Sequence, residues 1–336
     1  MRTKSMSKVL VIGASGQLGS VVLDQLLENG QECVAFVRPS SRFRPPDSQF
    51  LQVAYGDLAD FISVDNACEN VKKVIATAGS SVPLRGDKFM ADEVRHYQHL
   101  ITACLNHKVE HLVYISAFSS PYDGLISAFP VKRQIEQLIM MSGIPYTIFR
   151  GAAFMDIYYA VMGSRLAIAG VSQPTLLRAF WMTKLYSKVT NGLLENYGIA
   201  LLPGNGKVKQ PFVCIHDVAA FMVKALVIPT AKGRIIELGG PETLSWLDVA
   251  DIYAEVLGKK ISKLTIPSSL LNACRLVLRR LSPAGENIMG SLYVLGLYDI
   301  AIDMTAVSEE FAIKMTDTRQ FLLGKLKPMA TDSSKL

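Results

Sequence analysis

The chain has 336 residues, of which 50% are hydrophobic and 19% are charged. This length and composition exclude an intrinsically disordered protein and predict about two structural units. The formal net charge is +6, but lysines and arginines are scattered and form no basic stripe, so no nucleic-acid partner is expected. No apolar run approaches the roughly 18 residues that a membrane span requires.

The cysteines indicate a reducing compartment. All five are far apart in the chain and no two form a C-x-x-C pair, which favours free thiols in the cytoplasm or a similar setting. The first eight residues lack the apolar core of a signal peptide, so none is expected.

The first predicted elements are a strand, a glycine turn and a helix. The strand covers residues 9–12, the turn has the spacing G-x-x-G-x-x-G, and apolar residues at helical spacing follow from Val21. In this context such glycines allow a tight turn, a close approach to a pyrophosphate and close helix packing. The residues expected to bind a dinucleotide here are Gly13, Ser15, Gly16, Gln17, Leu18 and Gly19.

A second strand, residues 33–37, ends in Arg38. A site that prefers NAD(H) places a carboxylate near this point, whereas a guanidinium can pair with the 2′-phosphate of NADP(H). The sequence therefore favours NADP(H) over NAD(H) as cofactor. The alternative is a solvated basic loop without a ligand.

Strands and helices then alternate. Strands are predicted over 50–54, 72–77, 110–115 and 145–149, and helices over 61–69, 88–106 and 131–141. This alternation predicts an α/β fold with a doubly wound parallel (Rossmann) sheet, and a dinucleotide-binding domain over residues 1–150. Strand ends meet at one edge of such a sheet, which adds further candidate site residues. These are Asp57, Leu58, Thr77, Ala78, Gly79 and Ser116.

A smaller α+β substrate domain is expected over residues 151–327, followed by a flexible tail over 328–336. Strands near 211–215 and 234–238 could complete the sheet of the first domain, with a helix over 218–227 between them. Ser245 is the expected N-cap of a helix over 246–257. Residues 268–300 read as two amphipathic helices around Ser282-Pro283.

Two segments could contact something outside the fold. Residues 176–186 are aromatic and basic, and could cover a substrate, lie on a membrane surface or form an amphipathic core helix, of which the core helix is favoured. Residues 270–298 are the second candidate for a peripheral membrane or protein contact.

Four histidines lie close together in the sequence, at positions 96, 99, 107 and 111. Spacings of three and four can build metal sites on helices. These pairs instead fall at the end of a helix and the start of a strand, away from the cofactor edge, so no metal is expected.

Several motifs together resemble the NmrA-like and isoflavone-reductase-like group of atypical short-chain dehydrogenases/reductases over about residues 8–260. The motifs are residues 11–19, 37–38, 56–58, 113–116, 146–150, 216–219 and 239–242, with Lys132 and Glu136 between them. The resemblance implies an NADP(H)-binding domain, a lysine at Lys132 that binds the nicotinamide ribose and assists proton transfer, and Ser116 beside the nicotinamide. It also implies that Asp57 and Leu58 contact the adenine end.

The proton donor departs from the wider family. The tyrosine expected four residues before the lysine is Ala128 here, and the neighbouring Phe129 has no proton to give. Lys132 and Ser116 are therefore the catalytic candidates, while Lys132 could instead form a surface ion pair with Glu136. Tyr114 is expected to point away from the cofactor edge.

Arg150 ends a strand and could hold the loop on the nicotinamide side or pair structurally with Asp156 or Asp217, of which the structural role is favoured. Tyr122, Tyr158 and Tyr159 are further phenols that could enter the cleft from loops.

The leading hypothesis is an NADPH-dependent reductase of a small or medium apolar carbonyl or enone. The alternative is a regulator or assembly factor of the NmrA-like type that binds NADP(H) without turnover. Ala128 favours the second and Lys132 the first. An epimerase with tightly held NAD is a third reading, against which Arg38 argues.

Overall fold

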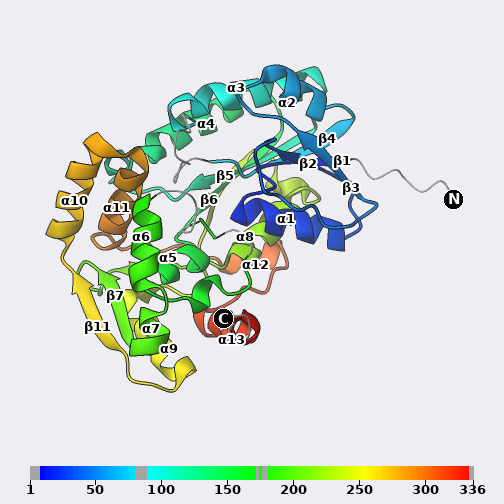
Figure 1. Cartoon of the computed structure of the whole chain (residues 1–336). Helices are drawn as coiled ribbons and strands as arrows, with labels where there is room; N and C mark the ends of the chain where they lie inside the picture. Colours follow the sequence, from blue (N-terminus) through cyan, green and yellow to red (C-terminus); the bar gives the residue numbers. More distant parts are fainter. Residues whose placement is uncertain (1–7, 80–88, 172–173, 176–180, 333–336) are drawn as a thin grey trace.

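The computed structural model describes residues 8–79, 89–171, 174–175 and 181–332 (Figure 1). Within them, seven strands form one parallel sheet in the order β3-β2-β1-β4-β5-β6-β9. Their bounds are β1 (Lys8–Ile12), β2 (Cys33–Val37), β3 (Leu51–Tyr55), β4 (Val71–Ala76), β5 (His111–Ala117), β6 (Tyr146–Gly151) and β9 (Arg234–Leu238). The chain leaves β1 in one direction and returns to β4 on its other side, which creates the switch point where such folds bind ligands.

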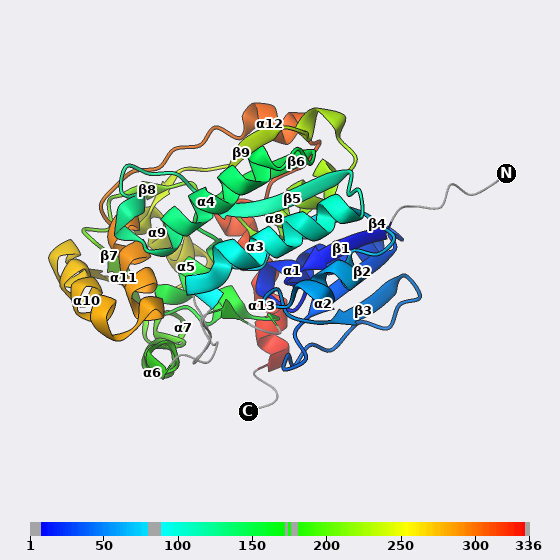
Figure 2. The same cartoon turned by 90° about the horizontal axis from the view of Figure 1, so that it is seen from above.

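Helices cover both faces of this sheet (Figures 1 and 2). One face carries α1 (Gln17–Glu28) and α8 (Ile215–Ala225), and the other carries α2 (Phe61–Ala67), α3 (Phe89–Asn106) and α4 (Ala128–Met141). Val9 and Val11 join the hydrophobic core on the α1 side of the sheet, while Leu10 and Ile12 join the core on the α3 side. Successive side chains of a strand point to opposite faces, so a sheet covered twice needs continuous apolar strands. The predicted doubly wound fold is confirmed.

Most of the remaining elements lie beyond one end of the sheet. Two small sheets pair β7 (Ile199–Pro203) with β11 (Ser262–Ile266) and β8 (Lys209–Gln210) with β10 (Leu244–Ser245). The helices are α5 (Met155–Val161), α6 (Trp181–Thr190), α7 (Leu193–Tyr197), α9 (Trp246–Leu257), α10 (Ser268–Leu281), α11 (Pro283–Leu295), α12 (Thr305–Glu310) and α13 (Thr318–Asp332), with 3-10 turns η1 (Asp123–Leu125), η2 (Leu166–Ile168) and η4 (Pro229–Ala231). Ser245 caps α9 as expected, in a capping box with Asp248. None of the helices within these residues is both long and apolar enough to traverse a bilayer.

Two predicted segments differ from the structure. The strand expected over 211–215 is absent from the described sheet, where Val213 forms a single bridge with Phe154 and α8 already begins at Ile215. The strand expected over 234–238 is present as β9, beside β6. At the other end, α13 continues to Asp332 where a flexible tail from residue 328 was expected.

Two hydrophobic cores, the one on the α1 side of the sheet and a second one beyond the end of the sheet, are each built from segments that alternate along the chain. Residues of α8 and β9, together with Met304 and Phe311, share the core of β1 and α1. The second core surrounds Trp246 and Tyr253. We propose that the dinucleotide-binding unit comprises residues 8–151, 213–238 and 304–315, instead of ending at residue 150.

Candidate cofactor and catalytic site

The glycine loop packs against the exit of β4. Gly13 has a φ of +83°, and a Cβ there would lie 2.8 Å from the amide nitrogen of Ala78. A Cβ on Gly19 would lie 2.1 Å from the carbonyl oxygen of Gly13, and the Gly16 amide donates to that same oxygen at 2.8 Å. Both outer glycines are therefore required by close backbone contacts.

The N-terminus of α1 suits an anion. Gly16 is its N-cap and supplies no side-chain cap, which leaves the first amides of the helix for a ligand. Gln17 is buried, and its Nε2 has no hydrogen-bond partner among the described residues. Its Oε1 accepts from the amide (2.9 Å) and hydroxyl (2.8 Å) of Thr175, far along the chain. Backbone amides and an orphaned amide nitrogen are donors that fit a pyrophosphate.

The other predicted cofactor residues lie at the same edge of the sheet. Arg38 follows β2 and is half-buried. The Asp57 carboxylate accepts from the Ala59 amide at 2.9 Å, and Leu58 is buried with its carbonyl 3.0 Å from His99 Nδ1. Ser15 lies in the glycine loop and Leu18 packs into the core beneath it.

Hydrogen bonds fix the exit of β4 on both sides. Thr77 Oγ1 donates to the Ile12 carbonyl at 2.9 Å, and the Tyr97 hydroxyl donates to the Ala78 carbonyl at 2.6 Å. Gly79 follows directly. These hydrogen bonds show that the ends of β1 and β4 are in direct contact. The sequence predicted only that both ends lie at the same edge of the sheet.

Lys132 lies at this exit with a partner that the sequence did not identify. Its buried Nζ is 3.4 Å from Glu93 Oε1, and a Cβ on Gly79 would lie 2.7 Å from that Nζ. The ammonium also lies 5.3 Å from the ring centroid of Tyr114. The alternative of a surface ion pair with Glu136 is not found, because the Lys132 ammonium lies against Glu93 of α3 and the exit of β4.

Glu136 instead holds two arginines and Ser116. Its carboxylate accepts from Arg133, from Arg150 at 2.6 Å and from the Ser116 hydroxyl at 2.5 Å. Burial alone would raise the pKa of Glu136, but the hydrogen bonds of Arg150 and Ser116 and the charge of Arg133 hold it below its usual value. The expected pairing of Arg150 with Asp156 or Asp217 is wrong, because its guanidinium binds the carboxylate of Glu136.

Arg133 also ties down the loop after β5. It donates to the carbonyl oxygens of Ala117 (2.8 Å) and Phe118 (2.6 Å) and to the Asp123 carboxylate (3.1 Å). Guanidinium groups suit such sites because their donors form a rigid planar fork. The network fixes Ser116, whose proton is donated to Glu136.

The phenols offer no obvious replacement for the missing tyrosine. Burial raises the pKa of Tyr114 well above its usual value, and its hydroxyl has no hydrogen-bond partner among the described residues. Tyr159 is fully buried and its hydroxyl is 2.8 Å from Thr318 Oγ1. Tyr122 packs against the ring of Tyr298, and burial raises the pKa of Tyr158.

At the position of the missing tyrosine, α11 fills the space. The Ala128 amide donates to Asn287 Oδ1 at 3.0 Å, and Ser127 donates to Glu286 at 2.5 Å. Both α11 side chains are buried, and Ala128 belongs to the second core.

Glu93, Glu286 and Asn287 were not identified from the sequence. Glu93 carried a usable signal, because it shares a helical face with the apolar Tyr97 and Leu100 and should therefore be buried. Nothing local marks Glu286 or Asn287, whose partners are far away in the chain.

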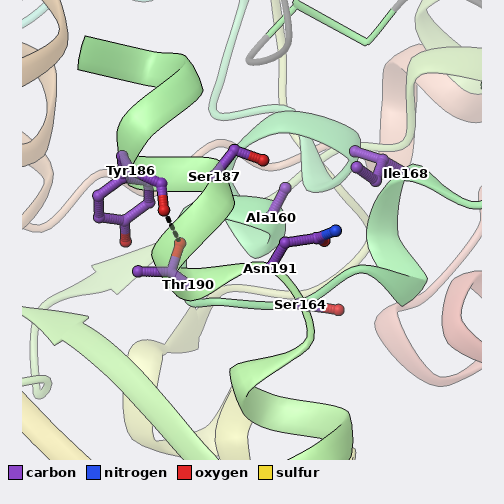
Figure 3. A pocket seen from close by; sticks show the side chains of 7 residues that line it. All are labelled: Ala160, Ser164, Ile168, Tyr186, Ser187, Thr190 and Asn191. Atoms are coloured by element: carbon purple, nitrogen blue, oxygen red, sulfur yellow. Dashed lines mark hydrogen bonds between the residues drawn. The ribbon is translucent and has the colours of Figure 1, made fainter.

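A separate small pocket lies between α5, η2 and α6 (Figure 3). Its lining is mostly small and polar, and none of the predicted site residues contributes to it: Ala160, Ser164, Ile168, Tyr186, Ser187, Thr190 and Asn191. Residues 176–180 of the aromatic-basic segment lie outside the described residues. In the described part of the chain, no three His, Cys, Asp or Glu residues gather as a metal site.

Comparisons with known proteins agree with the fold and the motifs. The NmrA-like family matches residues 5–322 of the chain. Phenylcoumaran benzylic ether reductase TP7 of Nicotiana tabacum is 27% identical over 276 residues, which cover 78% of each chain. Photosystem II assembly factor Ycf39 of Cyanophora paradoxa is 22% identical over 267 residues, or 80% of this chain and 74% of that one.

Among solved structures, an NADPH-dependent quinone oxidoreductase from Escherichia coli in complex with NADPH has the same fold. The TM-score is 0.67 at 19% identity, over 94% of this chain and 99% of that one. Since the family match spans nearly the whole sequence, the chain belongs to the NmrA-like family.

Proposed function

We propose that the protein binds NADP(H) at the glycine loop and reduces a small or medium apolar carbonyl or enone. The observation that carries the proposal is the shared contact at the exit of β4. Gly13 packs on Ala78 on one side of this exit, and the Lys132 ammonium lies against Gly79 on the other. A charged group is thus buried where the cofactor's reactive end would lie if its pyrophosphate occupied the loop.

The chain's own residues then have distinct roles. The cofactor supplies a hydride, and reduction also requires a proton near the developing negative charge. Lys132 holds protons on Nζ and would contact the nicotinamide ribose, while Glu93 orients that ammonium. Ser116 is fixed by Glu136 and Arg133, so its oxygen would help to position the reacting group.

The cofactor assignment is tested by calorimetric titration with NADPH and NADH. Arg38→Ala should weaken NADPH binding about tenfold or more, because charge-assisted hydrogen bonds to the 2′-phosphate are lost. NADH affinity should change little. Arg95→Ala, on the exposed side of α3, is the matched control. Equal affinity of the wild type for both cofactors would contradict the assignment.

The role of Lys132 is tested by turnover after removal of its charge. Lys132→Met alone leaves Glu93 buried without this counter-charge, so the informative variant combines it with Glu93→Gln. The double variant should bind NADPH within about threefold of wild type and lose at least about 100-fold in kcat, the lower end of the range for one acid or base. Glu93→Gln alone is the control, and its NADPH affinity should also be kept. Full activity of the double variant would remove Lys132 from the mechanism.

The alternative is a protein that binds NADP(H) without turnover and acts as a sensor or assembly factor. Its specific support is Ala128, which stands beside α11 and has no proton to donate at the position where the wider family is expected to carry a tyrosine. A relative named as an assembly factor adds support. Cofactor binding without NADPH oxidation across a broad panel of carbonyls and enones, in wild type and variants alike, would favour this alternative.

A further inference from the structure

The helix α10 exposes a stripe of large apolar side chains to solvent. Leu270, Val277 and Leu281 are 53%, 60% and 74% exposed, and Leu276 beside them is 50% exposed. Positions 270, 277 and 281 lie on one side of a helix, because they differ by seven and four residues. Large contiguous apolar patches are uncommon on soluble monomers and mark interaction surfaces.

Another side of α10 packs against the rest of the molecule. Leu271 and Leu278 are buried there, and Arg275 turns inward to Asn272 and toward Glu286 of α11. In both views α11 lies between α10 and the rest of the molecule, and α10 is at the end opposite β3 (Figures 1 and 2). The outer stripe is therefore not needed for packing within the chain.

Positive charge accompanies this stripe. Helix α10 contains three arginines and no aspartate or glutamate, and since Arg275 is turned inward toward Glu286, Arg279 and Arg280 are its exposed charges. Arg279 and Arg280 are exposed, and both flank the apolar side chains, because Arg280 lies one helical turn from Leu276 and Val277 and Arg279 lies one turn from Leu276.

The neighbouring helix α6 has the same character. It contains no acidic residue, and it exposes Lys184, Leu185, Lys188 and Val189. Tyr186 of α6 packs in the same small hydrophobic cluster as Leu271. The two helices thus share this cluster, and each exposes apolar and basic side chains.

We propose that the outer face of α10 binds an anionic lipid surface. Leucine and valine side chains would enter the boundary between headgroups and acyl chains, while Arg279 and Arg280 pair with lipid phosphates. A second copy of the chain fits less well, because a twofold interface sets the same patch against itself and α10 offers no acidic residue to pair with the arginines of its copy.

The test is flotation of the purified full-length protein with vesicles. Wild type should float with vesicles of phosphatidylcholine that contain about 30% of the anionic lipid phosphatidylserine. It should float poorly with pure phosphatidylcholine, and high salt should release it. Arg279→Glu/Arg280→Glu should weaken binding about tenfold or more, because each basic residue near an anionic surface contributes to affinity. Val277→Ser/Leu281→Ser should weaken it comparably.

Two control variants separate this face from general charge and hydrophobicity. Lys108→Glu/Lys314→Glu makes the same change in net charge at exposed sites elsewhere, and Ile62→Ser/Met141→Ser removes exposed apolar side chains from α2 and the end of α4. Both should float like wild type, and all variants should keep the wild-type circular dichroism spectrum. The proposal is overturned if wild type stays unbound with anionic vesicles or if the α10 and control variants float equally. A stable dimer broken by the α10 variants, without flotation, would assign the face to a second copy.

Discussion

His111 is buried, and its hydrogen bonds define which nitrogen of the neutral ring carries the proton. Thr147 donates its hydroxyl proton to the Ala231 carbonyl at 2.7 Å, so His111 Nε2, 2.9 Å from that hydroxyl, must donate to it. The other ring nitrogen, Nδ1, then carries no proton and has no hydrogen-bond partner among the described residues. Burial, followed by the charges of Lys232 and Lys73, lowers the pKa of His111 to about 4.

This arrangement predicts a loss of stability on acidification. Between pH 6.5 and 4 the unfolded chain binds a proton at His111 that the native state does not, so stability falls as pH falls through this window. The contribution is about 3 kcal/mol at most. The measurement is the denaturant midpoint against pH for wild type and His111→Asn, and the variant should show the shallower slope. Parallel slopes would show that His111 titrates normally.

At this scale the sequence predicted short-range relations better than charge partners. The spacing of Gly13, Gly16 and Gly19 identified the loop that the structure shows. The partners of Lys132 and Arg150 were not predicted, because an ion pair depends on which segments the fold brings together. Glu136 lies one helical turn from Lys132 in sequence, yet its carboxylate faces the strand ends.

The unit of strand, glycine loop and α1 tolerates no added atom at Gly19. An alanine Cβ there would meet backbone, which cannot move without shifting α1 from β1. Gly19→Ala should therefore lower stability by about 1–3 kcal/mol, as overpacking does, and weaken NADPH binding about tenfold or more. Gly124→Ala is the control, since no atom lies within 4 Å of its added Cβ. Thermal unfolding and calorimetry measure both, and equal behaviour of the two variants would show that the loop adapts.

The segment over 211–215 shows why elements were predicted unevenly. Strongly periodic helices such as α3 and α9 were identified near their true bounds. A short apolar run does not reveal whether it is a strand or a buried connection, because both hide their side chains. Phe212 and Val213 are buried, but they connect β8 to α8 instead of extending the sheet.

Helix α13 is linked through Asp156 of α5 to the start of α8, which packs on the large sheet. Lys325 Nζ lies 3.2 Å from Asp156 Oδ1 of α5, and Asp156 Oδ2 accepts from the Ile215 amide, where α8 begins, at 3.1 Å. One buried carboxylate thus joins three segments. This long-range arrangement has no signal in local sequence, whereas the return of residues 234–238 to the sheet was predicted from their apolar strand pattern.

Removing Lys325 should destabilise the whole molecule. Lys325→Met leaves Asp156 buried without its counter-charge, which typically costs about 3 kcal/mol. Adding Asp156→Asn should restore part of the loss. Urea unfolding of wild type and the single and double variants measures the coupling, and a single variant within about 0.5 kcal/mol of wild type, as at ordinary surface sites, would contradict a structural role.

The packing of α11 against Ala128 also limits which substitutions position 128 can accept. A tyrosine at position 128 would have to fit into a filled core, with its backbone amide already held by Asn287. Replacing Ala128 with tyrosine would therefore overpack this core and disturb folding. A helix that contributes none of the residues proposed to contact the cofactor thus restricts which side chains position 128 can carry.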